Sequence, residues 1–199
     1  HQDFSQLLDM LAELDAYMQT TRSLNNTIDA GILQNMFENN NSVFATIYDE
    51  NISLKNNCYE ADRTFFETWL TEMSASSQLN QNASNGVAGH LNEEFPLSGT
   101  NESSGYLVNA KGIEYQQIIT KRLMGASFFY LANELFLSEN ELNSDNETLV
   151  EGENYTPLEH HFDAAFASFG IPIDFPANSE DVRFWGKYCK ERNEDISGT

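Results

Sequence analysis

The chain has 199 residues, and its 31 acidic against 10 basic side chains give a net charge of −21 at neutral pH. A protein this acidic repels phosphate backbones, which argues against a nucleic-acid partner. Two cysteines are too few for a disulfide-built scaffold or a thiolate zinc site. No apolar run is long enough to cross a bilayer, so we expect an acidic globular protein without a transmembrane segment.

The composition favours a location outside the cytoplasm. Asparagine is abundant, and several Asn-x-Ser/Thr sequons occur, which are glycan acceptors only in a eukaryotic secretory pathway. The chain starts at His1 without a signal-peptide pattern, which indicates a processed chain or a fragment. Cys58 and Cys189 either form one disulfide or remain two buried thiols.

Three helices are predicted in the first 75 residues, because apolar side chains recur at spacings of three and four. They span about 3–22, 28–37 and 59–75, and 43–55 is either a short helix or a loop. The first helix has the clearest apolar stripe, formed by Phe4, Leu7, Leu8, Leu11, Leu14 and Met18. Residues 76–105 are poor in large apolar groups and are expected to form a long loop.

The segment 110–137 is apolar nearly all round, which is typical of a helix central to its bundle. Gly125 is expected to be a close-packing point on it. An acidic loop at 138–154 follows, and then Thr156, Pro157 and Glu159 form a capping box that starts a helix ending at Gly170.

The remaining residues are expected to form a rigid connector at 171–176 and a last helix from Ser179 to about 192. That helix would turn Val182, Trp185, Tyr188 and Cys189 inward. No period-2 strand is visible. The sequence therefore predicts an all-α, irregular bundle of five to seven helices with long loops, as one domain over 1–199 or the N-terminal part of a longer one.

The strongest candidate site lies on the capped helix, where Glu159, His160 and Asp163 follow one another at spacings that share a face. A histidine and a carboxylate placed so can hold iron, zinc or calcium. One helix supplies too few ligands, so a second element must contribute. The candidates are Glu114, Glu67, Glu72 and His90.

Two other interpretations of this cluster stay open. The acidic groups can serve only the helix dipole, with the histidines as ordinary hydrogen-bonding residues. Alternatively His160 or His161 is a general acid or base. Nucleophile, phosphate-loop and dinucleotide motifs are all absent from the sequence, which argues against an enzyme.

Four runs carry a resemblance to a bacterial family of secreted lipoproteins that is named only as a domain of unknown function. They are NAKGIEY at 109–115, KRLMGA at 121–126, LVEGENYTPLEHHFDAAF at 149–166 and RFWGKYC at 183–189. That family is similar in style to the imelysin-like proteins, which carry Gly-x-His-x-x-Glu on a helix. Here His160 matches, while Leu158 and Asp163 stand where the glycine and glutamate would be.

The resemblance implies a helical lipoprotein of the bacterial surface or periplasm, associated with iron, whose lipid anchor would have been lost upstream of His1. The function we expect is therefore that of an extracytoplasmic binding protein with an unknown protein or small-molecule partner. A metal-dependent hydrolase of the imelysin kind is the first alternative, and a structural or adhesive surface protein is the second.

Overall fold

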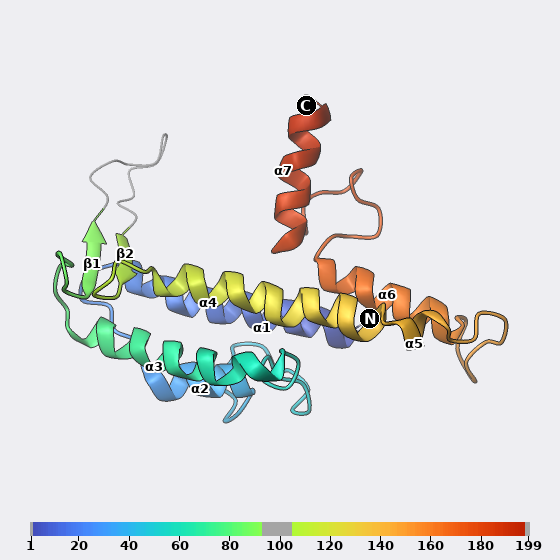
Figure 1. The fold of residues 1–199 in the computed structure, drawn as a ribbon, viewed down its shortest axis with the longest axis horizontal. Helices are drawn as coiled ribbons and strands as arrows, with labels where there is room; N and C mark the ends of the chain where they lie inside the picture. Colours follow the sequence, from blue (N-terminus) through green and yellow to red (C-terminus); the bar gives the residue numbers. More distant parts are fainter. Residues whose placement is uncertain (1, 93–104, 198–199) are drawn as a thin grey trace.

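The computed structural model describes residues 2–92 and 105–197, which form seven α-helices and one two-stranded sheet. The predicted fold class, an all-α irregular bundle with long loops, is confirmed. Helix α1 (Gln2–Gln19) runs along α4 (Tyr115–Leu123), and α2 (Ala30–Glu38) packs against α3 (Arg63–Gln78). Figure 1 shows these four helices side by side, with α6 (Pro157–Phe169) at the far end and α7 (Trp185–Ser197) standing out from the body.

The core lies between the first four helices, where the spacing pattern predicted it. On α1 the described apolar side chains are buried, and they are Leu7, Leu8, Met10, Leu11, Leu14 and Met18. The side chain of Phe4 lies outside the described residues. Helix α2 starts because the Asp29 carboxylate accepts a hydrogen bond from the Ile32 N–H, and it ends at Asn39 in the left-handed region.

The ambiguous segment 43–55 is a loop, and it is anchored to α1. Tyr48 donates its hydroxyl to Glu13 over 2.6 Å, and the Ala45 N–H donates to the same carboxylate over 2.8 Å. Burial raises the pKa of Glu13, but these hydrogen bonds outweigh it and lower that pKa overall. The loop therefore stabilises the charged form of the Glu13 side chain, and Glu13 in turn anchors the loop to α1.

The prediction that residues 76–105 form a long loop is wrong at both ends of that segment. Helix α3 continues to Gln78, and β1 (Gly89–Asn92) pairs antiparallel with β2 (Gly105–Val108). Strands of four residues are too short to show a period-2 pattern. A long-range contact holds this hairpin, since His90 is 1% exposed and its Nε2 lies 2.6 Å from the Thr21 carbonyl. Residues 93–104 of the predicted loop lie outside the described residues.

The central segment changes its helix type partway along. After α4 come two π-helical segments, Met124–Phe129 and Leu131–Phe136. The wider π turn breaks the 3.6-residue spacing, so the prediction that Gly125 is a close-packing point is wrong. A Cβ added to Gly125 would meet nothing within 4 Å. The expected acidic loop that follows contains a short helix, α5 (Glu139–Leu142).

The capping box that starts α6 is confirmed in both directions. The Glu159 N–H donates to the Thr156 hydroxyl, and the Thr156 N–H donates to the Glu159 carboxylate over 2.8 Å. Gly170 ends the helix at a φ of 80°.

The last helix begins at Trp185 and not near Ser179, because Phe184 just before it has a φ of 47°. Of the side chains expected to turn inward, Trp185 packs on the core, while Val182 and Cys189 are half-buried and Tyr188 is exposed.

Cys58 and Cys189 are both free thiols, and burial raises the pKa of Cys58 to about 11. Among the described residues no helix has the length and apolarity to span a membrane.

Candidate functional site

The predicted site residues occupy separate surroundings. Glu159 belongs to the capping box, and His160 stacks on Tyr155 with ring centroids 5.0 Å apart. Glu114 directly precedes α4, which Figure 1 shows starting beside β2, at the end of the bundle away from α6. Asp163 lines a cavity together with residues of α1 and of the connector after Gly170.

Glu159, His160 and Asp163 lie within about one turn of one another on α6, whereas Glu114 lies apart from them, just before α4. Over residues 2–92 and 105–197 no group of three or more His, Cys, Asp or Glu side chains is placed to hold a metal. His161 already has a partner, since its Nε2 lies 2.7 Å from a carboxylate oxygen of Glu141. The metal site stays a prediction, and it would need ligands beyond those that the described residues gather.

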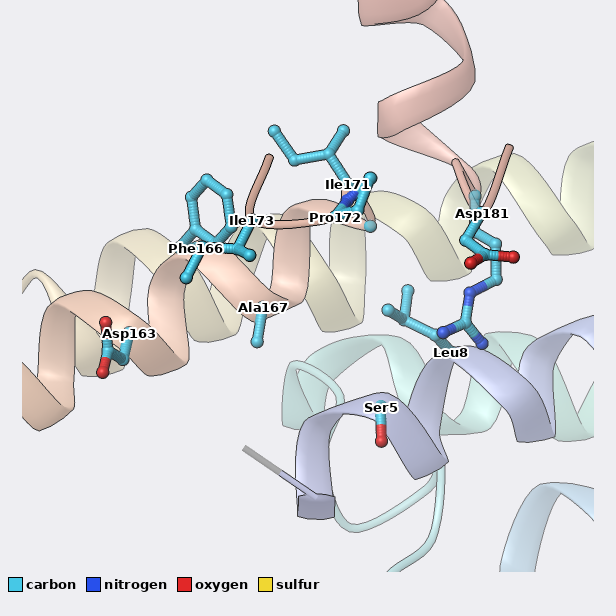
Figure 2. A pocket seen from close by; sticks show the side chains of 11 residues that line it. Ser5, Leu8, Asp163, Phe166, Ala167, Ile171, Pro172, Ile173 and Asp181 are labelled. Atoms are coloured by element: carbon cyan, nitrogen blue, oxygen red, sulfur yellow. The ribbon is translucent and has the colours of Figure 1, made fainter. Parts of the chain in front are cut away.

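The cavity that Asp163 lines is the candidate site that includes a predicted site residue. It has a volume of about 440 Å³ and lies between α1, α6 and the connector after Gly170. Its walls are mostly apolar, and Figure 2 shows that their side chains come from the three segments. The apolar lining residues are Leu8, Phe166, Ala167, Ile171, Pro172 and Ile173.

Several of these apolar side chains reach solvent. Ile173 is 93% exposed and Phe166 is 42% exposed. Phe162 and Phe169 follow the same face of α6 at four-residue and three-residue steps from Phe166, and both are exposed. An open apolar lining of this kind is typical of a surface that binds something.

The polar groups of the cavity lie at its margins. Figure 2 shows Asp163 at one end of the lining and Asp181 at the other, with the apolar wall between them. Arg183 also lines the cavity, but its guanidinium makes an ion pair with Asp9 on α1. The local balance of charge is therefore negative, as it is for the whole chain.

Two glycines, Gly170 and Gly186, let three backbone segments pack closely beside the cavity: the end of α6, the residues around Arg183 and the start of α7. The Arg183 N–H donates to the Gly170 carbonyl over 2.7 Å. A Cβ on Gly170 would come 2.4 Å from the Arg183 carbonyl oxygen, and one on Gly186 would come 2.2 Å from the Gly170 oxygen. Only glycine fits where the backbones approach so closely.

Sequence reasoning found one residue of the cavity, Asp163, and missed the rest. It treated 171–176 only as a rigid connector. The available signal in the sequence was the apolar pair Ile171 and Ile173 in the connector, together with the phenylalanine stripe on α6. The contribution of Ser5 and Leu8 from α1 had no signal, because they are more than 150 residues away in the chain.

Comparison with known proteins identifies the family. A family model described as "Domain of unknown function (DUF4856)" matches residues 5–199, so the chain belongs to this family. The expectation of a family named only as a domain of unknown function is thereby confirmed. No curated protein and no solved structure matches the chain.

Proposed function

We propose that this member of the DUF4856 family is a binding protein, and that the cavity between α1, α6 and residues 171–173 takes a small amphiphilic cation. The single observation that carries the proposal is the cavity itself, with an apolar wall flanked by the carboxylates Asp163 and Asp181. Its volume of about 440 Å³ falls in the range of ordinary small-molecule sites.

The charge of the site selects the ligand class. An apolar body gains free energy by covering Phe166 and Ile173, which stand open to water. A positive group at either end of that body would meet a carboxylate, whereas an anion would face both the lining and a net charge of −21. The chemistry therefore favours an alkyl or aryl amine over the matching alcohol or acid.

Calorimetric titration with octylamine, octanol and octanoate tests this, because the three share one apolar chain and differ in charge. We expect octylamine to bind most tightly and octanoate most weakly. The double variant Asp163→Asn with Asp181→Asn is expected to lower octylamine affinity about fivefold and to leave octanol affinity unchanged. Equal affinity for octylamine and octanoate would overturn the proposal.

A matched control is available on the same stretch of chain. Asp174 and Glu180 are exposed carboxylates that do not line the cavity. Asp174→Asn with Glu180→Gln removes the same charge from the protein as the test variant. If this control weakens octylamine binding as much, the effect is one of overall charge and the cavity is not the site.

The metal site at Glu159, His160, Asp163 and Glu114 remains a second proposal, supported by the residue types and by their spacing on α6. For it, we expect natively purified protein to carry stoichiometric iron, zinc or calcium by mass spectrometry. His160→Ala and Asp163→Ala should each lose it while remaining folded. Metal retained in both variants would contradict the proposal.

An extracytoplasmic location goes with the binding function as a further part of the proposal. It is supported by the acidic, asparagine-rich composition and by the resemblance to secreted lipoproteins. The hydrolase and the adhesive protein stay predictions from the sequence.

A further inference from the structure

A second cavity is lined by none of the candidate site residues that the sequence predicted. It has a volume of about 590 Å³ and is lined by α4, the first π-helical segment and the chain around Tyr59. None of its lining residues belongs to the cavity between α1 and α6. It is therefore a separate site.

Part of the lining of this cavity is the π-helical turn. Gly125 lies there with open space where a side chain would be. The turn is held on two sides, because the Ala126 carbonyl accepts from the Tyr59 N–H over 2.7 Å and the Met124 carbonyl accepts from Trp185 Nε1 over 3.0 Å. Single π turns inside helices are frequent at functional sites, and here the turn leaves bare backbone facing the hollow.

Aromatic side chains form one wall. The rings of Tyr59 and Tyr130 have centroids 5.4 Å apart and are tilted by 51°. Tyr59 is 49% exposed, and the neighbouring Phe129 is 60% exposed. These rings offer apolar faces to a ligand while the tyrosine hydroxyls can hydrogen-bond.

The formal charges of the side chains that line this cavity sum to zero. Asp62 and Arg122 form an ion pair at 2.6 Å, and the Arg122 guanidinium lies 4.2 Å from the ring centre of Phe65. Lys121 and Glu134 add one charge of each sign to the lining. In a chain with a net charge of −21, a site that is neutral overall does not select an ion, yet it presents fixed donors and acceptors side by side.

We infer that this second cavity binds a neutral saccharide. A sugar ring combines a face of C–H groups, which packs on aromatic rings, with hydroxyls that both donate and accept hydrogen bonds. The tyrosine wall matches the first property, and the Asp62–Arg122 pair matches the second. A small amphiphilic cation would find no excess of negative charge here, so the two cavities differ in ligand class.

Calorimetric titration with neutral disaccharides of glucose, galactose and mannose tests the inference, with sorbitol as the comparison. Sorbitol has the hydroxyls but no ring face to stack. We expect saturable binding of at least one disaccharide and none of sorbitol. Tyr59→Ala, which keeps the backbone hydrogen bond to Ala126, should lower that affinity about tenfold. Gly125→Leu should abolish it by filling the hollow.

Tyr155→Ala is the control, because it removes a tyrosine from the loop beside α6 that lines neither cavity. It should leave disaccharide binding unchanged, and thermal unfolding should show that all the variants are folded. If Gly125→Leu does not fold, Tyr59→Ala alone decides. Failure of the whole disaccharide panel, equal binding of sorbitol, or full affinity in Tyr59→Ala would each overturn the inference. Octylamine binding in the first cavity is a separate result and does not depend on it.

Discussion

Replacing Phe66 with alanine is expected to lower the free energy of unfolding by about 3–5 kcal/mol. The ring lies on α3 with no exposed surface. Its centroid is 5.6 Å from the centroid of the Phe37 ring on α2. Truncation leaves a cavity between two helices that contact each other along their length. Urea denaturation followed by circular dichroism measures the effect.

The same truncation at Phe166 separates stability from binding. This ring is 42% exposed and lines the first cavity, so Phe166→Ala should cost about 1 kcal/mol or less in stability. It should nevertheless weaken octylamine binding, because the ring is part of the apolar wall. If Phe166→Ala destabilised the protein as much as Phe66→Ala, the exposed phenylalanine would be part of the core and the proposed site would lose its main wall.

Gly186→Ala is expected to destabilise the protein by about 1–3 kcal/mol, because the new methyl group would overlap its neighbours. Its Cβ would lie 2.2 Å from the Gly170 carbonyl oxygen and 2.8 Å from a side-chain carbon of Ile171. Both neighbours line the first cavity, so octylamine affinity should fall together with the melting temperature. Differential scanning fluorimetry and calorimetry give the two values.

Gly125→Ala is the matched glycine substitution, since it adds the same methyl group inside the central helical segment. Its Cβ would meet no atom within 4 Å and φ there is not positive, so stability should rise by about 0.5–1 kcal/mol. Gly186→Ala as stable as the unaltered protein would contradict the close approach of α7 to Gly170.

Local signals in the sequence sufficed for most of the helices. Thr156, Glu159 and Gly170 predicted both ends of α6, because every hydrogen bond of the capping box joins residues three apart in the chain. The stripe on α1 predicted which side would be buried for a similar reason, since a helix repeats its faces every three to four residues.

The sequence was weaker where helix type changes or where a contact comes from far along the chain. The β1–β2 hairpin depends on His90 reaching the Thr21 carbonyl and on Gly105, whose Cβ would lie 2.2 Å from the Arg22 oxygen. The π turns took Gly125 out of the packed face on which regular spacing had placed it. No window of neighbouring residues contains these contacts.

By itself, then, the sequence determined the all-α class, the approximate positions of most helices, both ends of α6, the acidic character and the family-like runs around 109–126 and 149–166. Tertiary structure alone decided which polar residues share a site. It placed Glu114 just before α4, at the end of the bundle away from α6, and it joined Asp163 to Leu8, Ile173 and Asp181 around one cavity. The physical reason is that capping and amphipathic burial act between residues a few positions apart, whereas a cavity forms where distant segments fail to fill space between them.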